Sequence, residues 1–148
     1  MIFFLDINPP TATAQEKSVR IVGGRPIFYD PTPLKKAKAL LIAHLGNHRP
    51  IVPLDGALEL RTTWLFPVGK SHKSGEWRTT RPDTDNLQKM LKDCMTKCGY
   101  WKDDAQVVRE IVEKQWAAAF TLRSSSWGFS VHQAAMEKDT ATLQQEMR

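Results

Sequence analysis

The chain has 148 residues, of which 41% are hydrophobic, and its 21 basic and 16 acidic side chains give a net charge of +5. This size fits one domain with one core, and the apolar content excludes an intrinsically disordered chain. No apolar run approaches the roughly 18 residues of a membrane-spanning helix. The basic balance suits a polyanionic partner such as nucleic acid, although many soluble proteins are equally basic.

The N-terminal part of the chain predicts a strand and a hairpin. Residues 2–7 form a short apolar run rich in β-formers, which predicts a mostly buried strand. Two β-patterned segments, 18–22 and 25–29, flank Gly23-Gly24, and two strands around a Gly-Gly pair are typical of a tight hairpin.

A helix is predicted over residues 34–45. Thr32 suits its N-cap and Pro33 its first position, while Gly46-Asn47 suits its end. Leucines line one face, and three lysines, at positions 35, 36 and 38, lie largely off it. These lysines form an ordinary solvated face or contact a phosphate backbone, and the pattern leaves both interpretations open.

In the middle of the chain, a clearly predicted strand is followed by a basic segment. Residues 57–67 alternate between apolar and polar side chains, which predicts a half-buried strand. Residues 68–80 are polar and basic and predict a mobile loop. Such a loop beside an acidic site is well placed to hold a phosphate backbone, and otherwise it is a solvated connection.

A second helix is predicted from Leu87 to Cys98. Its apolar residues recur at helical spacing along one face, and Gly99 suits the position after its end. Asp85 and Gln88 have the spacing of a capping pair. Residues 107–116 are β-branched and partly alternating, so another strand is expected there.

The C-terminal part gives the weakest pattern. Residues 127–132 suit a last short strand. Residues 134–148 have helix-forming composition and suit a terminal helix, a dimer contact or a frayed end. The expected organisation is therefore one domain over residues 1–133, followed by a tail over 134–148.

Two pairs of carboxylates bracket the second predicted helix. Asp83 and Asp85 stand before it, Asp103 and Asp104 stand after it, and lysines and arginines surround both pairs. Carboxylates in a basic region indicate a metal ion that meets a phosphate, and oxygen ligands suit Mg²⁺ or Mn²⁺ better than zinc. A helix of about 14 residues spans roughly 21 Å. Asp104 can therefore join the first pair only from a strand that starts beside the helix N-terminus, or from a dimer partner.

Each of these residues also has a simpler interpretation. Asp83 or Asp85 suits a helix cap, Asp103-Asp104 suits a turn, and Lys89 suits a solvated helix surface. In the functional interpretation, Lys89 lies one helical turn after Asp85 on the same face. From there its ammonium group could stabilise the transition state of phosphodiester hydrolysis or orient the attacking water.

The segment 81–108 also carries a recognisable pattern, with RPDTDNLQK at 81–89 and GYWKDDAQV at 99–107. It resembles the RusA-type Holliday junction resolvases of phages and prophages. Their motif is approximately D-x-D-N-L-x-K, a helix that ends in glycine and an aromatic residue, and D-D-x-Q-V. The upstream strand, hairpin and proline-started helix follow the family's order of elements.

The resemblance implies a small α/β (α+β) endonuclease domain with a mixed β-sheet and two main helices. It implies a homodimer that cuts four-way DNA junctions symmetrically with Mg²⁺, or with Mn²⁺, as in DNA recombination and repair. Asp83, Asp85 and Asp104 match the essential acidic positions and are the expected metal ligands. Lys89 matches the catalytic lysine, and Asp103 matches the other acid of the second pair.

The expected function is therefore that of a Mg²⁺-dependent endodeoxyribonuclease, and the alternative is a non-catalytic, structure-selective DNA-binding protein. The short apolar N-terminus lacks the basic flank of a signal peptide, so a cytoplasmic protein without a membrane partner is expected. The basic residues near the acidic site match the family only in character and are expected DNA contacts because of their charge: Lys70, Lys73, Arg78 and Arg81.

Overall fold

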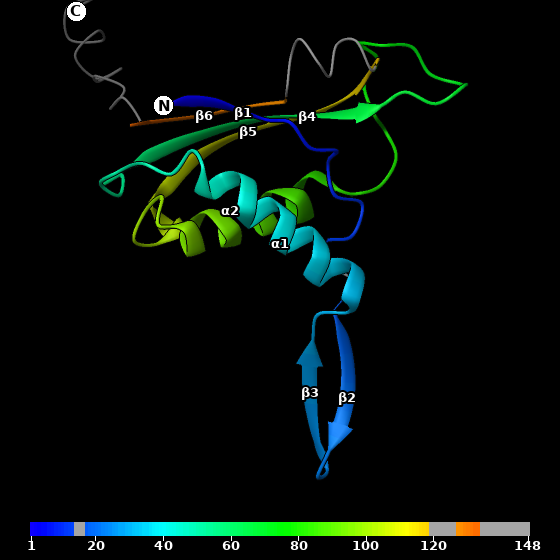
Figure 1. Ribbon diagram of the computed structural model, residues 1–148, viewed down its shortest axis with the longest axis vertical. Helices are drawn as coiled ribbons and strands as arrows, with labels where there is room; N and C mark the ends of the chain where they lie inside the picture. Colours follow the sequence, from blue (N-terminus) through cyan, green and yellow to red (C-terminus); the bar gives the residue numbers. More distant parts are fainter. Residues whose placement is uncertain (14–16, 119–126, 134–148) are drawn as a thin grey trace, which may run out of the picture.

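The computed structural model describes residues 1–13, 17–118 and 127–133, and it has a mixed four-stranded sheet, two helices and a separate hairpin (Figure 1). The predicted α+β architecture with two main helices is confirmed. The predicted tail 134–148 lies outside the described residues. The elements are β1 Ile2–Leu5, β2 Ser18–Val22, β3 Arg25–Tyr29, α1 Thr32–Gly46, β4 Leu58–Pro67, α2 Thr84–Cys98, the 3-10 helix η2 Asp104–Gln106, β5 Val107–Ala117 and β6 Trp127–Gln133.

The sheet has the strand order β1-β6-β4-β5, and its topology sets the direction of α2. Strand β4 pairs with β5 in parallel and with β6 antiparallel, and β1 pairs with β6 antiparallel. Helix α2 connects the end of β4 to the start of β5. Because β4 and β5 run in the same direction, α2 must run back against them. The C-terminal end of α2 therefore lies near the start of β5.

Both helices lie on one face of the sheet (Figure 1), and the core fills the space between the helices and the sheet. On β4, alternate residues from Leu58 to Phe66 are buried, as the period of two predicts, and Glu59 and Leu65 on the other face are buried as well. Leucines of α1 and the apolar face of α2 pack against them. Tyr100 and Trp101, which follow α2, are also buried. No helix in the described parts of the chain has the length and apolar character that a membrane span requires.

Strand β1 is buried on one side only, so the prediction of a mostly buried strand is wrong. Phe3 and Leu5 face the core, but Ile2 and Phe4 are 66% and 52% exposed. The reason is geometric, because successive side chains of a strand point to opposite faces and the helices cover one face of this sheet.

The helix N-termini differ from the predicted caps. Helix α1 begins at Thr32 after Pro31, so Thr32 is not the N-cap. Helix α2 has Asp83 as its N-cap, without a capping hydrogen bond from the side chain. Gln88 does not pair with Asp85, because it is buried and its Oε1 accepts a hydrogen bond from Thr62 Oγ1 at 3.0 Å. The predicted C-terminus is confirmed, with Gly99 in the left-handed conformation at φ +80°.

The predicted hairpin is confirmed and projects from the rest of the molecule (Figure 1). We call residues 18–29 the arm. Glycines 23 and 24 both have positive φ angles, as a tight two-residue turn between strands requires. Val19, Ile21 and Phe28 are 50%, 75% and 70% exposed, and the register puts them on one side of the ribbon.

Part of the basic segment 68–80 is attached to β5 rather than forming a simple loop. Gly75 N donates to Trp116 O, Trp116 N donates to Glu76 O, and Arg78 N donates to Lys114 O. The segment therefore runs along the free edge of β5 and reaches the start of α2 in a defined position.

Candidate active site

The first acidic pair lies at the N-terminus of α2. Asp83 is the N-cap residue, and its backbone carbonyl accepts a hydrogen bond from Leu87 N at 3.1 Å. Asp85 is in the first turn, where its Oδ1 accepts a hydrogen bond from Asn86 Nδ2 at 3.3 Å. Both residues are exposed. The positive end of the helix dipole favours negative charge at this position.

Lys89 is exposed and lies one turn further along α2 than Asp85. The helical spacing that the sequence predicted for this pair is therefore present. The helix below them is fixed to the sheet by the hydrogen bond between Thr62 and the buried Gln88. The carboxylates and the lysine thus project from a rigid element.

The second acidic pair lies beyond the opposite end of α2. Asp103 caps η2, because its Oδ1 accepts a hydrogen bond from Ala105 N at 2.8 Å and Gln106 Oε1 accepts one from Asp103 N at 3.2 Å. Gln106 Nε2 in turn donates to the carbonyls of Leu54 and Gly56. Asp103 therefore has a structural task, and the backbone that carries Asp104 is fixed by it.

One chain does not bring the two acidic pairs together. The 15 residues of α2 correspond to about 22 Å at 1.5 Å per residue. Within residues 1–13, 17–118 and 127–133, no three histidine, cysteine, aspartate or glutamate side chains form a group that could hold a metal ion. Strand β5 starts beside the C-terminus of α2, so it does not carry Asp104 back to Asp83 within the chain.

Lys114 lies near Asp83 instead, and Arg78 lies near Lys114. Lys114 Nζ donates to the carbonyls of Thr80 and Pro82, at 2.9 and 2.6 Å. Burial and the charge of Arg78 lower the pKa of Lys114, and the carboxylate of Asp83 acts to raise it. The sequence interpretation missed Lys114, although the alternation of β5 gives the signal: Lys114 stands opposite the buried Trp64, on the face that the helices cover.

Comparison with known proteins identifies the family of this sequence. The family model described as endodeoxyribonuclease RusA matches residues 8–122. The chain belongs to the RusA endodeoxyribonuclease family. It is 32% identical over 108 residues to the crossover junction endodeoxyribonuclease rusA of Lactococcus phage r1t, covering 72% of this chain and 81% of that protein. The Escherichia coli (strain K12) RusA protein is 64% identical over 28 residues, covering 19% of this chain and 23% of that protein.

The basic residues of this RusA family member fall into two groups. Lys70, Lys73 and Arg81 are exposed. Arg78 is half-buried, and its guanidinium carbon lies 4.1 Å from the Phe66 ring centroid and 4.3 Å from that of Trp116. Burial lowers the pKa of Arg78. Arg78 is therefore held against the body of the protein, whereas the other three side chains extend into solvent.

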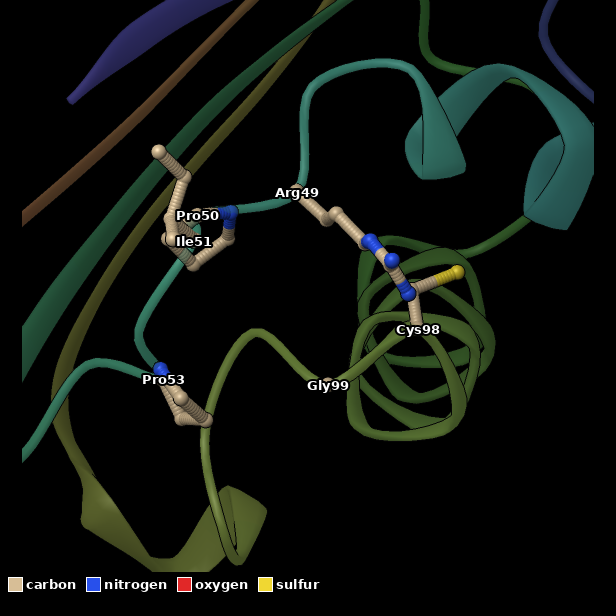
Figure 2. A pocket seen from close by; sticks show the side chains of 6 residues that line it. All are labelled: Arg49, Pro50, Ile51, Pro53, Cys98 and Gly99. Carbon is tan, nitrogen blue, oxygen red and sulfur yellow. The ribbon is translucent and has the colours of Figure 1, made fainter.

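The pocket in Figure 2 lies elsewhere, at the C-terminal end of α2. Its volume is about 400 Å³, and its lining contains no carboxylate: Arg49, Pro50, Ile51, Pro53, Cys98 and Gly99. Burial raises the pKa of the Cys98 thiol, and the charge of Arg49 opposes that shift. Cys94 is buried, Cys98 is partly buried, and both cysteines are free. This pocket does not coincide with either acidic pair.

Proposed function

We propose that this chain is a metal-dependent endonuclease that resolves four-way DNA junctions by symmetric hydrolysis of phosphodiester bonds. The observation that carries the proposal is a pair of exposed carboxylates at the start of α2, Asp83 and Asp85, in a member of the RusA family. The side chain of Asp83 makes no capping hydrogen bond to the helix. The phage r1t relative is a crossover junction endodeoxyribonuclease, and the similarity to it supports the same substrate.

The donor chemistry of the acidic site fits Mg²⁺ or Mn²⁺, because carboxylate oxygens are the ligands these ions prefer. Within the described part of one chain, however, Asp104 does not join Asp83 and Asp85 in a group that could hold a metal ion. We therefore place the third ligand, Asp104 of the partner subunit, beside them in a homodimer. A bound Mg²⁺ would supply an activated water and stabilise the negative charge that develops on the phosphate.

The side chains around the carboxylates have separate tasks in this proposal. Lys89 lies on the same helix face as Asp85, and its ammonium group would offset negative charge on the phosphate in the transition state. The exposed Lys70, Lys73 and Arg81 would hold the DNA backbone through phosphate contacts. Such contacts follow the shape of the junction and carry no direct sequence information.

A homodimer also suits the symmetry of the substrate. Two equivalent cuts across a four-way junction need two active sites related by a two-fold axis, which a C₂ dimer supplies. A surface hollow of about 570 Å³ borders Asp103 and is lined by Lys102 and Gln106 among others. It leaves the region of the second acidic pair open to the approach of a partner.

The proposal is tested with Asp85→Asn on a labelled four-way junction. The variant should bind the junction like the original chain and fail to cut it in Mg²⁺ or Mn²⁺. If the original chain binds junctions but leaves them intact in both metals, the enzyme proposal fails and a non-catalytic DNA-binding function takes its place.

The shared site is tested separately by subunit mixing. Asp85→Asn and Asp104→Asn chains, each inactive alone, are unfolded, mixed and refolded together. If the site combines two chains, the mixed dimer contains one intact site and nicks one strand. If each chain builds its own site, the mixture stays inactive, because every site then carries one substitution.

A further inference from the structure

The backbone that precedes Asp83 is held by two cations at three successive carbonyl groups. Lys114 Nζ donates to Thr80 O and Pro82 O, and Arg78 Nη2 donates to Arg81 O between them. Hydrogen bonds from a charged donor are stronger than those between neutral groups. The residues leading into α2 are therefore bound more tightly than an ordinary loop.

Both cations are themselves fixed by the sheet. Lys114 lies in β5 opposite Trp64, whose side chain is fully buried. Arg78 lies between the rings of Phe66 and Trp116, and its backbone N donates to Lys114 O at 3.0 Å. His72 stacks on Trp116 from the same segment, with ring centroids 4.4 Å apart. The two cations thus fix the start of α2 relative to the sheet.

We propose that Lys114 and Arg78 are positioning residues that fix the backbone at 80–82 and so hold the carboxylate of Asp83 in its working orientation. This inference rests on the proposed nuclease function. It changes the expected role of Arg78, whose guanidinium holds protein carbonyl and aromatic groups rather than extending towards DNA phosphates. Neither residue touches the reacting atoms, so their effect on the reaction passes through Asp83.

The test compares Lys114→Met with Lys92→Met. Lys92 makes a salt bridge with Glu110 and also joins α2 to β5, but it does so away from residues 80–83. Lys114→Met should lower the single-turnover cleavage rate by about 10- to 100-fold, the cost of a misplaced catalytic group. Its junction affinity should stay within about threefold of the original chain, because no DNA contact is removed. Lys92→Met should leave both the cleavage rate and the junction affinity unchanged.

Two further measurements separate positioning from general loss of structure. Lys114→Arg retains a cationic donor for the two carbonyls and should recover part of the lost rate. Hydrogen exchange measured by mass spectrometry should show faster exchange at residues 80–87 in Lys114→Met and unchanged exchange there in Lys92→Met.

The possible results are distinct. Equal rate losses in Lys114→Met and Lys92→Met, in proportion to lost stability, would overturn the positioning role. Weakened junction binding with an unchanged rate at saturation would make Lys114 a DNA contact instead. If the original chain does not cut junctions, the nuclease proposal fails, and hydrogen exchange still decides whether Lys114 orders residues 80–87.

Discussion

The hydroxyl of Thr62 in β4 donates a hydrogen bond to the amide Oε1 of Gln88 in α2 at 3.0 Å, and both residues are only 2% exposed. This bond joins the middle of the sheet to the first turns of the helix that carries Asp83 and Asp85. A polar pair in the core fixes the position of the helix more narrowly than apolar contacts do, because the bond exists in one alignment only.

Replacing Thr62 with valine should lower the free energy of unfolding by about 1–3 kcal/mol, because the buried amide of Gln88 loses its partner. Urea unfolding measures the change. In the double variant Thr62→Val/Gln88→Met, both polar partners are gone and much of the loss should be regained. A double variant that is as unstable as the sum of the two single variants would show that the pair is not coupled.

Asp103 and Asp104 should respond differently to substitution. Asp103→Ala removes the cap of η2 and should cost about 1 kcal/mol of stability, with a moderate fall in cleavage because Asp104 is less well held. Asp104→Ala should abolish cleavage and leave stability nearly unchanged. The measurements are thermal unfolding and single-turnover cleavage of a junction. Similar activity in both variants would contradict the separation of roles.

The salt dependence of junction binding should identify the phosphate contacts. For each of Lys70, Lys73 and Arg81, substitution with glutamine should reduce the slope of log K against log salt by about 0.9. Arg61→Gln is the control, because Arg61 lies in β4 and its charge is paired with Glu59. Titrations at several salt concentrations give the slopes. An equal reduction in the Arg61 variant would indicate a general charge effect.

The ion pair at the base of the arm should stabilise the protein only above acidic pH. Lys38 Nζ donates to Asp30 Oδ2 at 2.7 Å, and this bond lowers the pKa of Asp30 below its ordinary value of 3.8. The folded state thus favours the ionised carboxylate, so the contribution is present above 3.8 and is lost as pH falls through the lowered pKa.

We therefore expect Asp30→Asn to be less stable than the original chain by about 0.5 kcal/mol near pH 7. The difference should vanish in strong acid, where the original carboxyl group is also protonated. Urea unfolding across this pH range tests the expectation. A difference that grows as the pH falls would have the wrong sign.

Much of the fold could be predicted from the sequence, because periodicity and turn residues act locally. The alternation in β4, the Gly23-Gly24 turn and Gly99 after α2 each determine the local backbone directly. The capping pair of Asp85 and Gln88 was wrong for a tertiary reason, since Thr62 is far from Gln88 in the sequence and nothing local signals their contact.

The separation of the acidic pairs follows from strand direction, which the sequence did not specify. Once β5 is parallel to β4, Asp104 must lie at the far end of α2 from Asp83. The role of Lys114 was hidden for a similar reason. Its partners are main-chain carbonyls of residues 80 and 82, and carbonyl positions leave no trace in side-chain composition.

The projecting arm has a practical consequence for biochemical work on this protein. Arg20 lies in the exposed strand β2 and is followed by Ile21, whereas Arg25 beyond the Gly23-Gly24 turn is followed by Pro26, which prevents trypsin cleavage there. A two-stranded ribbon opens easily in solution, and a protease must open its substrate locally before it cuts. Brief trypsin treatment should therefore cleave the arm after Arg20, and DNA that shields the arm would slow that cleavage.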